Sequence, residues 1–252
     1  MKKRWVVGNW KLNKTCAEAR AFTEGLKAQL DGIGEQVACI IAPPSTALHT
    51  VATAAAGSPL GVAAQNIYAQ DAGAFTGEIS APLAAEAGAT YTLVGHSERR
   101  ALFGETDGLC ADKLAAAARA GLCPILCVGE SAQDRAQGRT AQVVQEQLHN
   151  ACGRYLQKQQ GPLMVAYEPI WAIGTGQTPA PKEAQAVHAL LHQTLGALGA
   201  DAAAAVPLLY GGSVTADNAK DFAQQPNIHG VLVGGASLTL QSFLRIATAL
   251  SA

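Results

Sequence analysis

Residues 163–176 read Leu-Met-Val-Ala-Tyr-Glu-Pro-Ile-Trp-Ala-Ile-Gly-Thr-Gly and describe one strand followed by a loop. The unit begins with an apolar run, Leu163–Ala166, and places a carboxylate, Glu168, directly before a proline. Because proline disfavours helical geometry in the residue before it, Glu168 is expected at the end of a strand on a stiff backbone. Small residues follow, including Gly174 and Gly176. The layout is typical of a general base under a mobile lid, and an ordinary strand terminus is the alternative.

The same strand-then-helix unit recurs along the chain. The predicted strands are Trp5–Gly8, Val37–Ala42, Leu60–Ala64, Tyr91–Gly95, Pro124–Val128, Leu163–Ala166, Leu208–Tyr210 and Gly230–Val233. Eight units in 252 residues predict an α/β protein, a closed (β/α)8 barrel in a single domain over residues 1–252. An open doubly wound sheet is the alternative, although the turn after the first strand lacks the G-x-G-x-x-G pattern that often marks such sheets.

Helical segments fill the intervals between the strands. The first opens with a capping box, Thr15 to Glu18. Apolar residues at helical spacing then predict the buried faces of three helices: Phe22, Leu26 and Leu30 in the first, Val187, Leu191 and Leu195 in the sixth, and Phe243, Ile246 and Leu250 in the last.

Composition narrows the class of partner. A formal charge of -1 argues against nucleic acid or an anionic membrane surface as the main partner, because both require basic patches. The basic N-terminus continues into only a short apolar stretch, Trp5–Val7, which is too short for a signal peptide. With no run long enough for a membrane span, we expect a soluble, cytoplasmic protein.

Six cysteines are scattered along the chain. The pair Cys123 and Cys127 lies within an apolar strand and lacks the paired spacing of a metal site. Buried free thiols are therefore predicted, with a disulfide or a zinc site as the alternatives.

Polar residues and glycines follow several strands, where the active sites of barrels are built. Asn9 and Lys11 follow the first strand, His96 the fourth, and Glu168 the sixth. Taken singly, a lysine is more often a solvated charge and a histidine more often structural. His96 precedes a predicted helical turn, and the positive end of the helix dipole disfavours an imidazolium there.

Glycine pairs follow the last two strands: Gly211-Gly212-Ser213 and Gly234-Gly235. Glycine lets backbone N–H groups approach a ligand closely, and the loops after strands 7 and 8 of barrels often bind phosphate. One pair alone would indicate a tight turn, but two pairs at these positions favour a phosphate site. With one carboxylate base, one imidazole and one lysine, the set fits proton transfer beside a carbonyl in a small phosphorylated sugar.

The segments carrying these residues resemble the triosephosphate isomerase family, in family order from residue 8 to residue 237. They are Gly8-Asn-Trp-Lys11, Gly73-Ala-Phe-Thr-Gly-Glu78, Val94-Gly-His-Ser-Glu-Arg-Arg100, Ala166-Tyr-Glu-Pro-Ile-Trp-Ala-Ile-Gly-Thr-Gly176, Tyr210-Gly-Gly-Ser-Val214 and Leu232-Val-Gly-Gly-Ala-Ser237. The resemblance implies cofactor-free and metal-free interconversion of dihydroxyacetone phosphate and D-glyceraldehyde 3-phosphate through an enediol(ate), in glycolysis and gluconeogenesis.

The resemblance also implies a role for each site residue. Glu168 would be the base, His96 the neutral electrophile and proton shuttle, and Lys11 the cation, supported by Asn9, with Glu98 nearby. The phosphate would be held by backbone groups of Gly174, Ser213, Gly234 and Gly235. A lid from Pro169 to about Pro179 would exclude water.

Two further segments bear on assembly and lid motion. The long loop from Gln65 to Ser80 would, by the resemblance, pack into a second subunit and place Thr76 beside the neighbour's Asn9 and Lys11, making a homodimer. At the lid's end, Gln177-Thr178-Pro179 departs from the Lys-Thr-Ala or Lys-Ser-Ala of many family members. Proline stiffens this hinge, so we expect an altered opening rate with unchanged chemistry.

Two rivals remain at the level of the sequence. Another phosphosugar barrel enzyme, such as an aldolase, would need a Schiff-base lysine, and Lys11 is the only lysine placed at a strand end. A non-catalytic binding protein on the same fold would not need Asn9, Lys11, His96 and Glu168 together.

Overall fold

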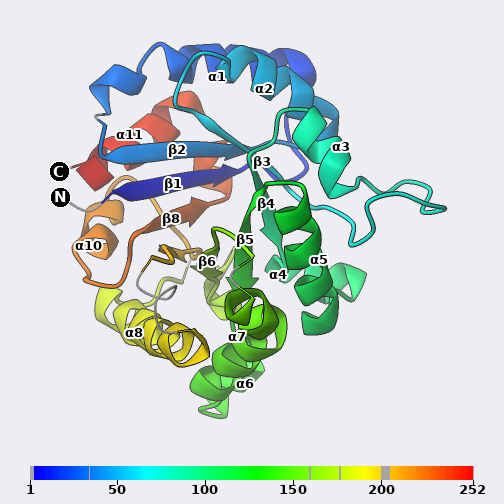
Figure 1. Ribbon diagram of the computed structural model, residues 1–252. Helices are drawn as coiled ribbons and strands as arrows, with labels where there is room; N and C mark the ends of the chain where they lie inside the picture. Colours follow the sequence, from blue (N-terminus) through cyan, green and yellow to red (C-terminus); the bar gives the residue numbers. More distant parts are fainter. Residues whose placement is uncertain (1–2, 34, 159, 176, 200–204, 252) are drawn as a thin grey trace.

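A computed structural model describes residues 3–33, 35–158, 160–175, 177–199 and 205–251. Within these ranges, eight parallel strands pair in chain order, and β8 pairs back onto β1 to close a barrel (Figure 1). The strands are β1 Arg4–Asn9, β2 Val37–Ala42, β3 Gly61–Ala64, β4 Tyr91–Val94, β5 Cys123–Val128, β6 Met164–Tyr167, β7 Leu208–Tyr210 and β8 Gly230–Val233. The predicted (β/α)8 barrel is confirmed.

Where the observed strand bounds depart from the predicted ones, the difference is one residue. Gly95, predicted in the fourth strand, leaves it because its φ is 71° and its N–H donates to a side chain, Glu105, instead of a neighbouring strand. In the pairing of β1 with β2, Arg4 extends the first strand by pairing with Val37.

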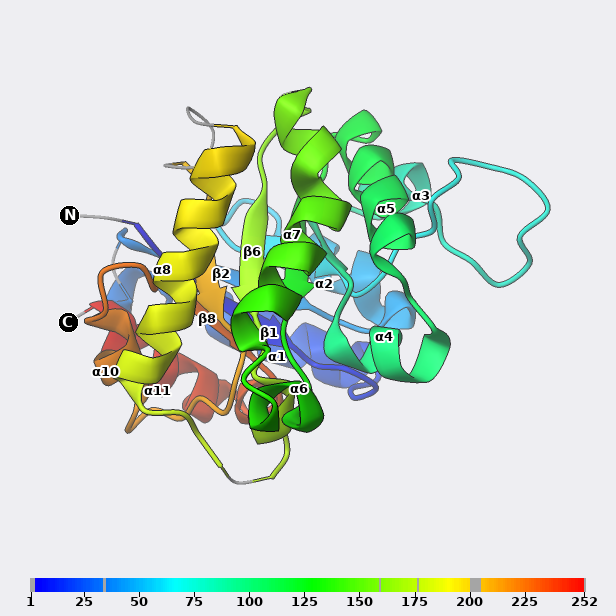
Figure 2. The ribbon, with the colours of Figure 1, turned by 90° about the horizontal axis from the view of Figure 1, so that it is seen from below.

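Helices surround the barrel, as Figures 1 and 2 show. They are α1 Cys16–Lys27, α2 Leu48–Ala55, α3 Ala81–Glu86, α4 Ser97–Phe103, α5 Asp107–Arg119, α6 Ala132–Ala136, α7 Thr140–Gln157, α8 Pro181–Leu198, α10 Ala219–Ala223 and α11 Leu240–Ser251. Four short 3-10 helices are η1 Leu30–Gly32, η2 Ser45–Ala47, η3 Ile170–Ala172 and η4 Gly235–Ser237 among the described residues. The helices α7 and α8 are the longest, with 18 residues each, and no described helix is long and apolar enough to cross a membrane.

The capping box predicted for the first helix is present, because Thr15 and Glu18 bond each other's backbone N–H groups. Phe22 and Leu26 are buried on its inner face, but Leu30 lies beyond the helix end, in η1, and is half-buried. In α8, Leu191 and Leu195 are buried while Val187 is half-buried, and the three apolar residues predicted for the last helix are all buried in α11.

The strands are apolar on both faces because each face packs against a different part of the core. Val7, Ile40 and Leu93 belong to the cluster that fills the barrel interior. Their neighbours Val6 and Ile41 belong to the larger cluster between the strands and the helices. Alternate residues therefore serve alternate layers, which is why these strands read as continuous hydrophobic runs.

The six cysteines, all among the described residues, are free thiols. Cys39, Cys110, Cys127 and Cys152 are buried, as predicted, and Cys123 is half-buried. Cys16, at the start of α1, is exposed, so the prediction of a buried thiol is wrong there. It is the first residue of the helix, on the same side as the buried Ala19 and Thr23 but at the exposed end, where its Sγ donates to Thr46 O at 3.2 Å.

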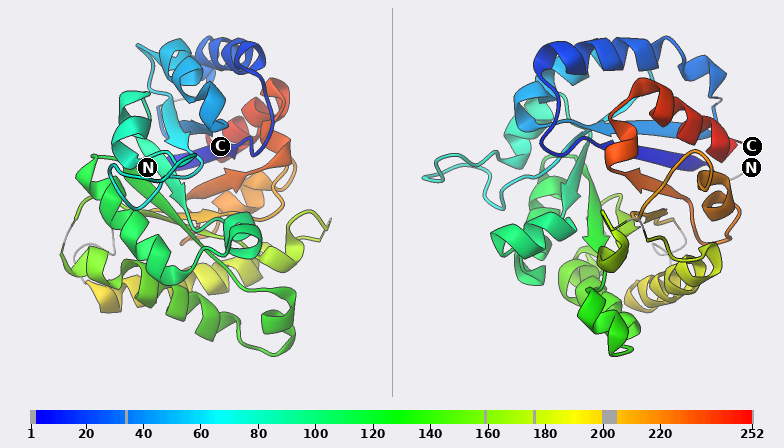
Figure 3. Two further views of the ribbon diagram at one scale, coloured as in Figure 1. Left: turned by 90° about the vertical axis from the view of Figure 1, so that its right-hand side faces the viewer. Right: turned by 180° about the vertical axis from the view of Figure 1, so that it is seen from behind.

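Between β3 and α3 a long segment projects from the barrel (Figures 2 and 3). We call residues 65–80 the arm. At the base of the arm, the N–H of Tyr68 donates to Ile79 O at 2.8 Å. The rings of Tyr68 and Phe75, with centroids 4.6 Å apart, pack against each other within the arm. Arg119 of α5 pairs with Asp71 at 2.8 Å.

We predict that Gly230→Ala weakens closure of the barrel. A Cβ at Gly230 would lie 2.2 Å from the carbonyl oxygen of Trp5, its partner across the β1–β8 seam, so the backbones must separate. The free energy of unfolding should fall by about 1–3 kcal/mol or more, measured by urea denaturation at fixed protein concentration. In the control, Gly196→Ala, the added methyl meets open space within α8, and stability should be unchanged or higher. Equal stability of the two variants would contradict the prediction.

Candidate active site

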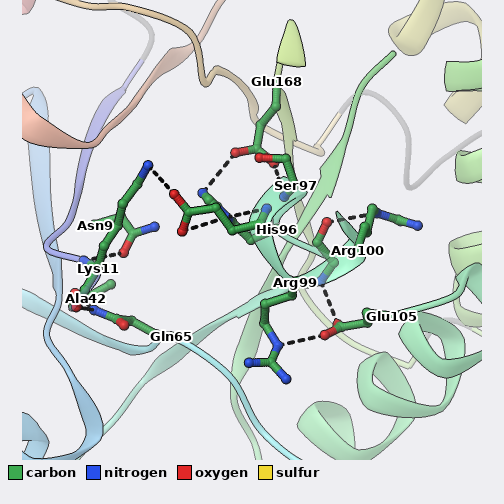
Figure 4. Close-up of polar contacts among 12 residues, drawn as sticks. Asn9, Lys11, Ala42, Gln65, His96, Ser97, Arg99, Arg100, Glu105 and Glu168 are labelled. Atoms are coloured by element: carbon green, nitrogen blue, oxygen red, sulfur yellow. Dashed lines mark hydrogen bonds and ion pairs between the residues drawn. The ribbon is translucent and has the colours of Figure 1, made fainter. Parts of the chain in front are cut away.

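The predicted site residues converge at the carboxyl ends of the strands (Figure 4). Asn9 ends β1, and Lys11 lies two residues further on. His96 is the N-cap of α4, two residues after β4, and Glu168 directly follows β6. All four line one cavity of about 360 Å³, together with residues from the loops after β7 and β8.

Glu168 is buried, with 2% of its surface exposed, and both carboxylate oxygens have partners. Oε1 lies 3.0 Å from His96 Nε2, and Oε2 accepts the backbone N–H of Ser97 at 2.8 Å. The backbone N–H of Glu168 donates to Val128 O at 2.8 Å, which continues the strand ladder to this residue. The acid is therefore held at a fixed place on the strand end, as Pro169 led us to expect.

Two glycines make room for this acid. A Cβ at Gly129 would lie 1.8 Å from the carbonyl oxygen of Glu168, and one at Gly211 would lie 3.0 Å from its Cγ. Any larger residue at Gly129 would displace the strand end that carries the carboxylate. The absence of a side chain at Gly211 therefore leaves space for Glu168, in addition to the place of this glycine in the loop after the seventh strand.

His96 receives a hydrogen bond on one ring nitrogen and faces a carboxylate with the other. The backbone N–H of Glu98 donates to Nδ1 at 3.3 Å, so the neutral ring carries its proton on Nε2, toward Glu168. This N-cap position matches the helix start expected from the sequence.

The expectation that the helix end depresses the pKa of His96 is wrong for this arrangement. Burial lowers the pKa of His96, but the carboxylate of Glu168, and after it that of Glu98, raise it by more in total, so the net shift is upward from the ordinary value. The dipole effect amounts to about 1 kcal/mol or less at a helix terminus, which two carboxylates within 4 Å outweigh.

Lys11 has an unusual backbone and an acidic partner. Its φ is 52°, in the left-handed region that non-glycine residues seldom adopt. The side-chain oxygen of Asn9 accepts the N–H of Lys11 at 3.0 Å, and Gln65 Nε2 donates to the Lys11 carbonyl at 2.9 Å. Lys11 Nζ lies 2.6 Å from Glu98 Oε1, so Glu98 contacts both Lys11 and His96.

The glycine loops meet on the other side of this cavity. Its wall includes Gly174 from the lid, Ser213 after β7, and Gly234 and Gly235 after β8. A Cβ at Gly234 would lie 3.4 Å from Lys11 Cε, so the lysine stem runs beside this loop. After Gly234 the chain forms the short η4, and α11 follows it.

The predicted lid begins in η3 and ends before α8. Gly174 and Thr175 are exposed, Pro179 is buried, and Gly176 lies outside the described residues. Ser213 Oγ donates to Ala172 O at 3.2 Å, which ties the start of the lid to the loop after β7.

The residues that sequence reasoning missed hold the loop that carries His96. Glu105 Oε1 accepts the N–H of Gly95 at 3.0 Å, and Arg100 Nε donates to the carbonyl oxygen of Gly95 at 2.8 Å. The buried Lys113 lies 3.0 Å from Glu105 Oε2, and Arg99 Nε lies 2.7 Å from the same oxygen. No sequence pattern marks Glu105 or Lys113. Arg99 and Arg100 lie in the segment quoted after the fourth strand, and Gln65 directly follows β3, so their position at a strand end could have indicated them.

A second hollow of about 560 Å³ opens beside the first and shares Asn9, Lys11 and His96 with it. Exposed apolar side chains line it, including Leu12 (96% exposed) and Phe103 (67%). Across the residues that the structure describes, no group of three or more His, Cys, Asp or Glu side chains is placed to hold a metal ion.

Comparison with known proteins gives one consistent result. The family model described as triosephosphate isomerase matches residues 4–250. Triosephosphate isomerase of Roseiflexus sp. (strain RS-1) is 48% identical over 242 residues, covering 96% of this chain and 95% of the relative. The protein of the same name from Synechococcus sp. (strain JA-2-3B'a(2-13)) is 51% identical over 246 residues, covering 96% and 94%.

Among solved structures, the crystal structure of triosephosphate isomerase from Bartonella henselae matches with a TM-score of 0.87 and 32% sequence identity. The match covers 98% of each chain.

We predict that Glu98→Gln lowers the pKa of His96. The substitution removes a carboxylate that raises this pKa and leaves the cation of Lys11, which lowers it, without its partner. Titration of the imidazole nitrogens by ¹⁵N NMR measures the shift. The exposed Glu86→Gln on α3 is the control and should leave the His96 titration unchanged. An unchanged or higher pKa in Glu98→Gln would show that Glu168 and burial alone determine the titration.

Proposed function

The chain belongs to the triosephosphate isomerase family and interconverts dihydroxyacetone phosphate and D-glyceraldehyde 3-phosphate, and we propose that Glu168, His96 and Lys11 perform this chemistry. The reaction is a step of glycolysis and gluconeogenesis. The observation that carries the proposed roles is the direct contact of Glu168 with His96 in a cavity that Lys11 also lines.

Glu168 acts as the base. It removes a proton from the carbon beside the carbonyl of one triose phosphate and returns it to the neighbouring carbon, by way of an enediol(ate). Both of its oxygens are engaged by Ser97 and His96, so the carboxylate must exchange at least one of these partners for the substrate carbon. Its burial supports this role, because a site closed to solvent keeps water away from the carboxylate and from the enediol(ate).

His96 and Lys11 stabilise the charge that develops on the substrate oxygens. Nε2 of His96 points toward the carboxylate of the base, so a carbonyl oxygen placed beside that carboxylate would accept its proton. Lys11 supplies positive charge beside the Gly234 loop, and its Nζ lies 2.6 Å from Glu98 Oε1. Asn9 contributes by fixing the Lys11 backbone.

The substrate phosphate binds to the glycine loops. Gly234 and Gly235 present backbone without side chains, and Ser213 and Gly174 lie on the same wall of the cavity. Closure of the lid would bring the backbone of Gly174 onto the phosphate and exclude water from the enediol(ate). Pro179 is buried at the far hinge, which supports a stiff C-terminal end for this motion.

A homodimer completes the assembly. The arm projects beyond its own barrel, and the hollow beside Lys11 is lined by exposed apolar residues that a second arm would cover. Thr76 at the exposed end of the arm would then lie near Asn9 and Lys11 of the other subunit. We place this dimer in the cytoplasm, in keeping with the chain's near-neutral charge and its metabolic substrate.

The first test is isomerisation of D-glyceraldehyde 3-phosphate in a coupled assay. Rapid turnover is expected for the wild type, and Glu168→Gln should lower kcat by about three to four orders of magnitude, because the base is lost. Pro179→Ala should reduce turnover by less than Glu168→Asp does, since the hinge affects motion and not chemistry. No turnover in a folded wild type would defeat the assignment of roles, and a loss in Pro179→Ala equal to that in Glu168→Asp would defeat the view of the hinge.

The dimer is tested through the arm. Thr76→Glu would bury a carboxylate against the apolar residues of the hollow, and the cost of desolvating it should shift the protein to monomers with reduced turnover. Sedimentation velocity and the concentration dependence of specific activity measure this change. Thr248→Glu, on the exposed side of α11, is the matched control and should remain dimeric. A monomeric, fully active wild type would exclude the proposed dimer.

A further inference from the structure

Arg135, in the short helix α6, contacts both ends of the lid. Its guanidinium lies 3.9 Å from the ring centroid of Trp171, and its Nη2 lies 3.6 Å from Glu183 Oε1. Trp171 belongs to η3, where the lid begins, and Glu183 lies in the first turn of α8, just after the lid ends. One side chain from outside the lid thus joins its two hinges.

Trp171 is held from a second direction as well. Its Nε1 donates to Glu130 Oε1 at 2.9 Å, and the hydroxyl of Tyr167 donates to the same oxygen at 3.0 Å. Glu130 is fully buried. The indole therefore lies between a buried carboxylate at its edge and a guanidinium over its face, an arrangement that favours the cation at the ring face.

Glu183 fixes the other end of the lid. Its Oε2 accepts the backbone N–H of Ala180 at 3.0 Å, which defines the start of α8 directly after Pro179. The pair with Arg135 is partly exposed and is worth little by itself, but it directs the guanidinium toward both hinges at once.

We infer that Arg135 is a positioning residue for the isomerisation. It stabilises the open lid seen in the structure, in which Gly174 and Thr175 are exposed, relative to a closed lid that covers the substrate. The inference rests on the proposed role of the lid. Arg135 acts through Trp171 and Glu183, since the cavity beside Glu168 is lined by other residues.

The direction of the effect follows from population shift. On this inference the stack belongs to the arrangement seen in the structure, so its loss raises the population of the covering arrangement. A cation over a partly exposed ring changes such an equilibrium by about two- to fivefold. Ligands that bind under the lid should then bind more tightly and leave more slowly.

The test compares Arg135→Met, Arg135→Lys and Glu183→Gln in the full-length enzyme. Arg135→Met should lower both KM and kcat, and lower the Kd for inorganic phosphate, by about two- to fivefold. Arg135→Lys keeps a charge for Glu183 but loses the planar stack, so it should resemble Arg135→Met more than the wild type. Glu183→Gln keeps the stack and should have the smallest effect.

A direct readout is the ¹⁹F spectrum of 5-fluorotryptophan enzyme, in which the Trp171 signal is assigned with Trp171→Phe. Addition of phosphate should move this signal further toward its bound position in Arg135→Met than in the wild type at equal phosphate concentration. The matched control is Arg139→Met, because the guanidinium of Arg139 pairs with Asp134 of α6, the helix that also carries Arg135. It should leave KM, phosphate affinity and the Trp171 signal unchanged.

A fall in kcat with unchanged KM and an unchanged Trp171 signal in Arg135→Met would indicate only a less stable protein and would overturn the inference. Equal changes in Arg139→Met would overturn it as well. Either failure is separate from the proposed function, which wild-type turnover and Glu168→Gln test without reference to Arg135.

Discussion

The pairing of β1 with β8 is the constraint on which the site depends. Lys11 follows the first strand and Gly234 the last, so only closure places the lysine stem where a side chain at Gly234 would touch it. An open sheet would leave these two loops at opposite edges, with the cation far from the glycine loops. The seam is narrow because Gly230 has no side chain to keep the Trp5 backbone away. Close packing at Gly230, where β8 begins, thereby determines where the cation of Lys11 lies at the other end of the strands.

Charged side chains of both signs surround His96, some facing its ring and others lying behind its loop. Glu168 and Glu98 face the ring from two sides, while Lys11 offsets the charge of Glu98. Behind the loop, Glu105 is balanced by the buried Lys113 and by Arg99. Buried ion pairs of this kind contribute little net stability, because desolvation offsets their attraction. Their value here is geometric, since each one fixes a backbone or side-chain position next to the reacting groups.

The sequence was sufficient for the barrel and for the side chains that line the cavity, because both follow from local patterns. Strand periodicity and strand-end position are properties of short segments, and Glu168, His96 and Lys11 were found by them. What it did not provide depends on contacts between distant segments. The Glu105–Lys113 pair, the Ser97 N–H on Glu168 and the upward shift in the pKa of His96 arise only when separate strand ends meet. Leu30 was misplaced for a simpler reason: α1 ends at Lys27, and apolar spacing alone does not show where a helix stops.

The distribution of the cysteines has a practical consequence. Burial raises the pKa of the Cys39, Cys110 and Cys152 thiols to about 12 and that of Cys123 to about 11, and it raises the pKa of Cys127 as well. At neutral pH these five side chains hold almost no thiolate, the form that reacts with oxidants and alkylating agents. Cys16 stands at the surface, on the first turn of a helix whose position in the barrel wall is fixed. A thiol-reactive dye would therefore label each chain at Cys16, and fluorescence labelling would need no introduced cysteine.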